Sequence, residues 1–155
     1  MTKEDVPRLL RHNVKAWVGY IESVSPEQLR ERPDDATWSG LEYAEHVRDV
    51  FRVFHARLNL MLVFANPTFD NWDQDEAAIS LRYGTGDPDV VLRSLVRAGS
   101  GFAAAVEDVP LASIPRKGTR SNGSEFTIRT LPLYALHDLV HHLWDVTGAR
   151  FTPNP

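Results

Sequence analysis

The strongest constraint on the fold of this chain is a long helical pattern with a well-marked start. Ser39 is followed three residues later by Glu42, which is the spacing of a capping box. In that motif the serine side chain accepts from the Glu42 N–H, and the Glu42 side chain accepts from the Ser39 N–H. Apolar residues then recur at three- and four-residue steps: Tyr43, Val47, Val50, Phe51, Phe54, Leu58, Met61 and Leu62. The pattern predicts a long amphipathic helix that ends near Asn66 and Pro67.

Three further segments have the same periodicity, over about residues 5–23, 88–110 and 130–147. Asp87 followed by Pro88 is a typical helix start, with an N-cap side chain and a proline in the first turn. Gly148 stands where a left-handed residue commonly ends a helix. Four such helices predict an all-α protein, a four-helix bundle that forms a single domain over residues 1–155.

Smaller elements are expected between these helices. Residues 25–29 predict a turn or short helix, and an acidic segment at 69–76 predicts a short extra helix that ends before Gly84. Within 116–129, the Asn122-Gly123 pair lies between short stretches of strand-like residues, which predicts a small β-hairpin before the last helix. We expect this hairpin to cover or line a pocket.

Composition excludes several classes of function. The chain has 155 residues, with 17 basic and 21 acidic side chains and no run of like charges, so a nucleic-acid-binding surface is not expected. It has no cysteine, which excludes disulfides, thiolate metal sites and a cysteine nucleophile, so any metal must be held by nitrogen and oxygen. There is no signal-peptide pattern and no apolar run that could span a bilayer. We therefore expect a cytoplasmic protein without a membrane partner.

Histidines carry the main functional signal. His137 and His141 are four residues apart, so on a helix they stand one turn above the other and can bind the same cation. On the helix that begins after Ser39, His46 lies at the border of the apolar face, and His55 points the opposite way. Only one of these two histidines can face the site, and we favour His46 as the third ligand because it lies near the start of its helix. His142 is expected to face solvent or to lie behind the ligands.

A structural interpretation of the same histidines stays open, because a histidine at a helix border is more often a hydrogen-bonded edge residue than a ligand. Asp49, Asp138 and Asp145 could orient ligand imidazoles, although exposed helical aspartates are the commoner case. No catalytic residue and no cofactor-binding residue other than the metal ligands is assigned from the sequence.

Two motifs resemble those of the DinB-like superfamily. The first is Trp38-Ser39-x-x-Glu42-x-x-x-His46-Val47-x-Asp49, and the second is Leu136-His137-Asp138-x-x-His141-His142-x-x-Asp145-Val146. The resemblance extends from His12 to Val146 and implies a bundle of up-down-down-up topology with a divalent metal, zinc, nickel or iron, in a pocket at the bundle end. It places the histidine triad of the family on His46, His137 and His141.

The resemblance also implies a function. Relatives are thiol-dependent transferases or isomerases that use mycothiol or bacillithiol, and their metal lowers the pKa of the bound thiol. We therefore expect a metal-dependent enzyme that activates such a thiol, or a water, against a small electrophilic substrate. The alternatives are a metal-binding or ligand-binding bundle without turnover, and a purely structural bundle acting through a dimer interface. A homodimer is compatible with the broad helical faces.

Overall fold

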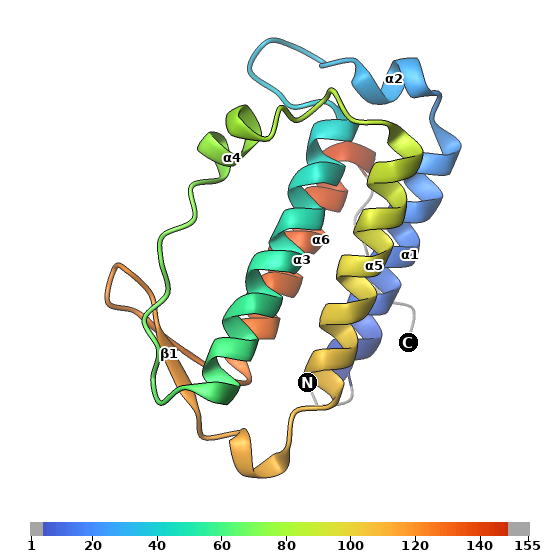
Figure 1. The fold of residues 1–155 in the computed structure, drawn as a ribbon. Helices are drawn as coiled ribbons and strands as arrows, with labels where there is room; N and C mark the ends of the chain where they lie inside the picture. The colour runs from blue at the N-terminus through green and yellow to red at the C-terminus, as the bar shows by residue number, and fades with distance from the viewer. Residues whose placement is uncertain (1–4, 149–155) are drawn as a thin grey trace.

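A computed structural model describes residues 5–148, and four long helices dominate it (Figure 1). They are α1 (Asp5–Ser23), α3 (Gly40–Val63), α5 (Pro88–Glu107) and α6 (Thr130–Thr147). These helices confirm the all-α prediction.

The bundle has the up-down-down-up topology implied by the resemblance. α1 and α6 run in one direction and α3 and α5 in the other, as the colours of Figure 1 show. α1 packs against α5 and α6, and α3 packs against the same two helices. The consecutive long helices α1 and α3 therefore lie diagonally opposite each other, and α3 has α6 as an antiparallel neighbour.

Local capping interactions set the helix boundaries where the sequence predicts them. Both hydrogen bonds of the capping box between Ser39 and Glu42 are present at the start of α3. Asp87 caps α5 by accepting from two backbone N–H groups of its first turn. Gly148 ends α6 with φ of 64°, in the left-handed region that glycine adopts without strain.

The smaller elements surround the bundle: one lies at each end, and α4 and the hairpin lie beside α3 (Figure 1). They are α2 (Pro26–Arg30), α4 (Gln74–Ser80), the 3₁₀-helix η1 (Leu111–Ser113), β1 (Lys117–Thr119) and β2 (Glu125–Thr127). β1 and β2 form the predicted antiparallel hairpin, in which Gly118 pairs with Phe126 and Gly123 turns the chain with φ of 86°. The hairpin packs against α3 and α6.

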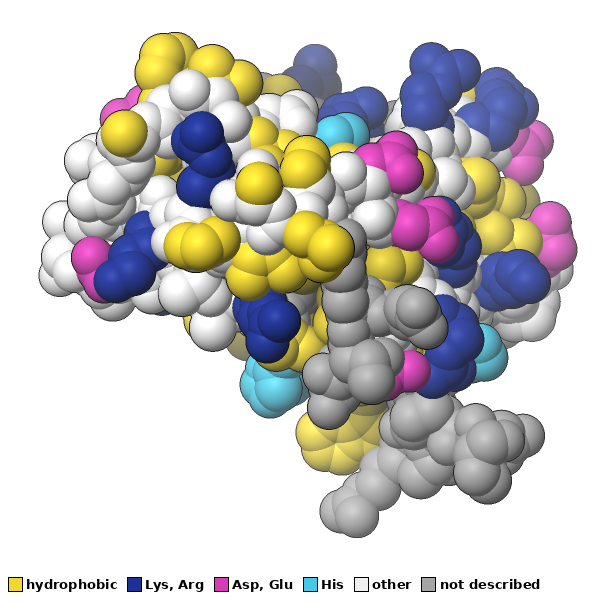
Figure 2. Space-filling view, turned by 90° about the horizontal axis from the view of Figure 1, so that it is seen from below, with side chains coloured by type: hydrophobic (Ala, Val, Ile, Leu, Met, Phe, Trp, Pro, Cys, Tyr) yellow, Lys and Arg dark blue, Asp and Glu magenta, His cyan; other side chains and the backbone are white. Residues whose placement is uncertain are grey.

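Within residues 5–148 the core is mainly apolar, although it also encloses polar side chains such as Asn13 and His46. Its largest fully buried side chains include Trp17 of α1, Phe51 of α3, Phe102 of α5 and Leu139 of α6. On the end of the bundle that Figure 2 shows, basic and acidic side chains are interspersed with exposed hydrophobic ones, and no face of one sign is seen there. Within residues 5–148, no helix is both long enough and apolar enough to cross a membrane.

The connection between α3 and α5 is fastened to α3 by buried polar groups. The Tyr83 hydroxyl donates to the Asp49 carboxylate, which also accepts from Arg48 at 3.0 Å. The Gly84 N–H donates to Glu45 Oε2 at 2.6 Å. These contacts hold the connection against the first half of α3, beside His46.

Candidate metal centre

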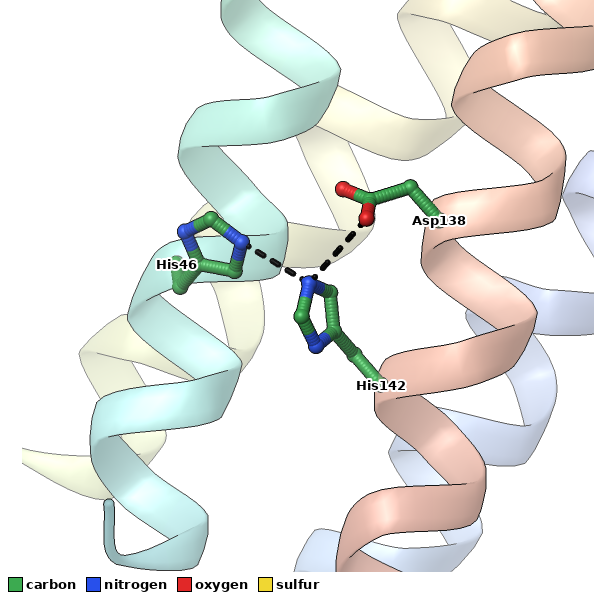
Figure 3. Close-up of side chains that lie close together, drawn as sticks. All are labelled: His46, Asp138 and His142. Atoms are coloured by element: carbon green, nitrogen blue, oxygen red, sulfur yellow. Dashed lines mark hydrogen bonds and ion pairs between the residues drawn. The ribbon is translucent and has the colours of Figure 1, made fainter. Parts of the chain in front are cut away.

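Three side chains from two helices converge in the upper half of the bundle, as it is drawn in Figure 1. His46 comes from the second turn of α3, whereas Asp138 and His142 stand one turn apart on α6 (Figure 3). His46 Nε2 lies 3.0 Å from His142 Nε2, and the latter lies 3.4 Å from Asp138 Oδ1. One ligand atom from each residue lies within 4.8 Å of the other two.

The antiparallel packing of α3 and α6 explains this convergence. His46 follows the start of α3, and His142 precedes the end of α6, so the two residues reach the same level of the bundle. Asp138 and His142 have the four-residue spacing that places two side chains on one side of a helix. Two antiparallel helices with the correct axial alignment are therefore enough to bring the three side chains together.

His46 is held in an apolar, aromatic environment. It is fully buried, its ring is parallel to that of Trp72 with the ring centres 5.6 Å apart, and the ring of Trp38 lies edge-on with its centre 5.2 Å away. Burial, together with the neighbouring charge of His142, lowers the pKa of His46 from 6.5 to about 4. The imidazole is therefore neutral near pH 7 and has a lone pair to offer.

His142 is oriented by two carboxylates. Its Nδ1 lies 3.2 Å from Asp145 Oδ2, and its Nε2 faces Asp138. Burial lowers the pKa of His142, but the hydrogen bonds and charges of Asp138 and Asp145 outweigh burial and raise it above 6.5. When Nδ1–H donates to Asp145, the lone pair of Nε2 points to the place where the three side chains meet, as is common for histidines that bind metals.

The donor set fits a divalent metal. Two imidazole nitrogens and a carboxylate are established ligands of zinc and of other first-row metals, and three protein ligands leave positions open for a substrate. The 3.0 Å between the two Nε2 atoms is close to the separation of about 3.3 Å that two nitrogens on one tetrahedral zinc require. The pKa of Asp138 is affected most by burial, which raises it, but the neighbouring histidines outweigh burial and lower it, so the carboxylate is charged.

The structure brings only one of the three predicted ligands, His46, to this cluster. His137 and His141 are exposed, and within residues 5–148 neither belongs to a group of three metal-ligating side chains. His141 instead lies with its Nδ1 3.2 Å from Asp145. Of the two positions expected for His142, solvent exposure is not found, because this residue is half-buried and its Nε2 lies 3.0 Å from His46 Nε2.

His137 and His141 lie outside the cluster because α6 is rotated about its axis relative to the orientation that the sequence suggests. A core face built on the aliphatic residues of α6 would include Leu133 and Val140, but Leu133 is exposed, whereas Ala135 and Leu139 are fully buried. With 100° of rotation per residue, the centre of the observed buried face lies about 80° around α6 from the centre of the face built on the aliphatic residues. This rotation brings His142 toward the core. The pair Asp138 and His142 has the same four-residue spacing as the predicted pair, so spacing alone could not distinguish them.

The aspartates differ in their roles. Asp145 contacts His142, as expected of a residue that orients a ligand, and Asp138 itself belongs to the cluster. Asp49 instead binds Tyr83 and Arg48.

A pocket of about 250 Å³ adjoins the cluster and shares Asp138 with it. Its walls come from α3, α6, the segment before α4 and the tip of the hairpin. Trp72 links the two sites because it stacks on His46 and also lines the pocket. The hairpin residues Arg120, Ser121 and Asn122 line the pocket, which confirms the predicted position of the hairpin.

A sequence profile of the DinB superfamily matches residues 9–146. No curated protein sequence matches the chain.

Two solved structures have a similar fold. YfiT from Bacillus subtilis, described as a probable metal-dependent hydrolase with an unusual four-helix bundle topology, is 20% identical, with a TM-score of 0.83 over 94% of this chain and 84% of its own. A mycothiol-dependent maleylpyruvate isomerase is 11% identical, with a TM-score of 0.77. That match covers 95% of this chain but only 61% of the isomerase. At these identities the similarity concerns the fold.

Proposed function

Because this chain belongs to the DinB superfamily, we propose that it is a metal-dependent enzyme in which His46, Asp138 and His142 hold one divalent cation. The observation that carries the proposal is the convergence of two imidazole nitrogens and a carboxylate beside a pocket. Zinc and nickel are the metals that we favour, since both bind imidazole readily, and iron is a third candidate.

The proposed reaction attacks a small electrophile with a low-molecular-weight thiol of the mycothiol type, or with water. When bound, a divalent metal supplies this chemistry by lowering the pKa of a coordinated thiol or water. The chain itself contributes no cysteine, so the thiol would come from a second substrate. His142 is held by Asp145, Trp72 covers His46, and the pocket gives the electrophile a place beside the ligands.

The ligand assignment is tested by comparing neighbouring histidines. His142→Ala and His141→Ala remove the same group from adjacent positions, one inside the cluster and one exposed. We expect untagged wild-type protein, purified without a nickel column, to contain about one equivalent of metal by elemental mass spectrometry. His142→Ala should lose most of that metal, and His141→Ala should keep it.

The opposite result, loss in His141→Ala and retention in His142→Ala, would restore the ligand set predicted from the sequence. A wild-type protein that stays metal-free after incubation with zinc, nickel and iron would refute the metal site altogether. Asp145→Asn offers a finer test, because losing a group that orients a ligand costs about 10- to 100-fold in metal affinity.

Catalysis is tested separately. The metal-loaded protein is incubated with mycothiol and a panel of small electrophiles, and thiol consumption is followed over many turnovers. Sustained turnover that is lost in His142→Ala supports a thiol-dependent enzyme, and turnover without thiol supports hydrolysis. Stoichiometric binding alone would indicate a binding protein and refute the enzyme.

A further inference from the structure

Two arginines line the pocket beside the candidate metal centre without a carboxylate to neutralise them. Arg57 lies on α3 and Arg120 at the hairpin tip, and both are half-buried. Within residues 5–148 neither forms an ion pair, and Arg57 donates only to the Asp70 carbonyl oxygen at 3.2 Å. The pocket therefore has two positive charges on its wall, and its one acidic lining residue, Asp138, belongs to the metal cluster.

Aromatic rings hold both guanidinium groups in place. The Arg57 Cζ lies 5.4 Å from the centre of the Phe54 ring, and the Arg120 Cζ lies 5.2 Å from that of Tyr134. Phe54 and Tyr134 are themselves stacked, with ring centres 5.8 Å apart. The two cations therefore flank one aromatic cluster, and each is positioned without using all of its N–H donors.

The two positive charges also act on each other. Burial lowers the pKa of Arg57, and the charge of Arg120 lowers it further, because the groups are near enough to repel. An anion between them would relieve this repulsion and accept hydrogen bonds from two guanidinium forks.

We propose that this pocket binds the anionic group, a carboxylate, of a small organic substrate through Arg57 and Arg120. The inference rests on the proposed function, since it names the substrate class of the same site. The pocket volume of about 250 Å³ lies below the range of about 300–1,000 Å³ that is usual for drug-sized ligands, so the ligand is small. Phe54 and Tyr134 contact its apolar part, and Asp138 lies where the pocket meets the metal ligands.

The test measures binding of benzoate by isothermal titration calorimetry, with benzamide as the uncharged probe of the same shape. Benzoate should bind wild-type protein, and benzamide should bind at least tenfold more weakly. Inorganic phosphate forms the second arm, because guanidinium groups also bind phosphate. Tighter binding of phosphate than of benzoate would overturn the assignment to a carboxylate.

Variants locate the binding site. Arg57→Gln and Arg120→Gln should each weaken benzoate binding by about tenfold or more, as expected for loss of a charge-assisted hydrogen bond. Arg97→Gln, which removes the same charge from an exposed position of α5, should leave binding unchanged. Should Arg57→Gln fail to fold, Arg57→Lys keeps the charge but loses the fork, and an intermediate affinity is expected.

The two proposals fail in distinguishable ways. Arg57→Gln and Arg120→Gln should keep their metal, whereas His142→Ala should lose metal and still bind benzoate. Equal affinity of benzoate for wild-type protein and for both glutamine variants would overturn the anion site and leave the metal centre untouched. Absence of binding to the wild type up to about 10 mM would overturn it as well.

Discussion

Gly19 and Gly99 should respond in opposite ways to the same substitution by alanine. Both lie in helix interiors, Gly19 in α1 and Gly99 in α5. A Cβ atom at the exposed Gly19 would meet no heavy atom within 4 Å. At Gly99 it would lie 2.4 Å from Val14 Cγ2 and 3.0 Å from Phe51 Cε2. At Gly99, therefore, α5 lies too close to side chains of both α1 and α3 to admit a methyl group without a shift.

The expected free energies follow from two opposing effects. Alanine stabilises a helix interior by about 1 kcal/mol relative to glycine, and this gain applies at both positions. At Gly99 the short, buried side chain of Val14 and the buried ring of Phe51 must move, and such overpacking costs about 1–3 kcal/mol. We expect Gly19→Ala to raise the free energy of unfolding by about 1 kcal/mol, and Gly99→Ala to lower it by about 1 kcal/mol.

Urea unfolding followed by circular dichroism measures both free energies against the wild type. Thermal midpoints should move in opposite directions, by about 2–4 °C per kcal/mol for a domain of this size. Equal stabilisation by the two substitutions would refute the reasoning, because it would mean that the contact between α5 and its neighbours has room for a methyl group.

Two further predictions concern the polar groups on α3. Tyr83→Phe removes a hydrogen bond to the buried Asp49 carboxylate and should cost about 1.5–3 kcal/mol in urea unfolding, whereas Tyr20→Phe, whose hydroxyl has no hydrogen bond within residues 5–148, should cost less than about 0.5 kcal/mol. Burial and Asp49 raise the pKa of Tyr83, so the contribution of its hydroxyl to the free energy of unfolding is complete below about pH 10. This contribution should fall as the pH rises above about 10 in the wild type, and Tyr83→Phe should lack this loss. Burial raises the pKa of Glu42, but hydrogen bonds, chiefly from Arg32, outweigh burial and lower it. The contribution of Glu42 to the free energy of unfolding is therefore present above about pH 4.5 and is lost as the pH falls through the lowered pKa. Glu42→Gln should therefore be less stable at pH 7 and lose less stability on acidification; equal acid sensitivity of the two proteins would contradict this.

Helix boundaries could be predicted because their causes are local. The hydrogen bonds of Ser39, Glu42 and Asp87 join groups within three residues of each other, and Gly148 needs only its own backbone freedom. A single sequence contains everything that these interactions require.

The direction in which α6 faces could not be predicted in the same way. Leu133 and Leu139 have the same side chain and both fit a helical period, yet one is exposed and the other is fully buried. Packing of α6 against α1 and α3 decides between them, and this packing depends on residues far away in the sequence. For this reason the sequence predicts His137 and His141 as partners of His46, whereas in the structure Asp138 and His142, each one residue further along α6, lie beside it.

The sequence placed the hairpin at a pocket, but it did not show which side chains form the pocket wall. Trp72 reaches His46, and Arg120 reaches Tyr134, only after the connection and the hairpin have folded against the bundle. Aromatic and arginine residues at such positions are indistinguishable from ordinary surface residues in one sequence.

The parallel orientation of α3 and α5 has a consequence for how this site can vary. Because both helices start at the same end, residues 64–87 must return along the whole of α3, which is about 36 Å long at 24 residues. An antiparallel pair would need only a short turn. Here the long return segment packs beside α3 and contributes Asn71, Trp72 and Gln74 to the pocket. Substitutions in this crossing segment can therefore reshape the pocket for other substrates while the four helices, and the residues proposed to hold the metal, stay unchanged.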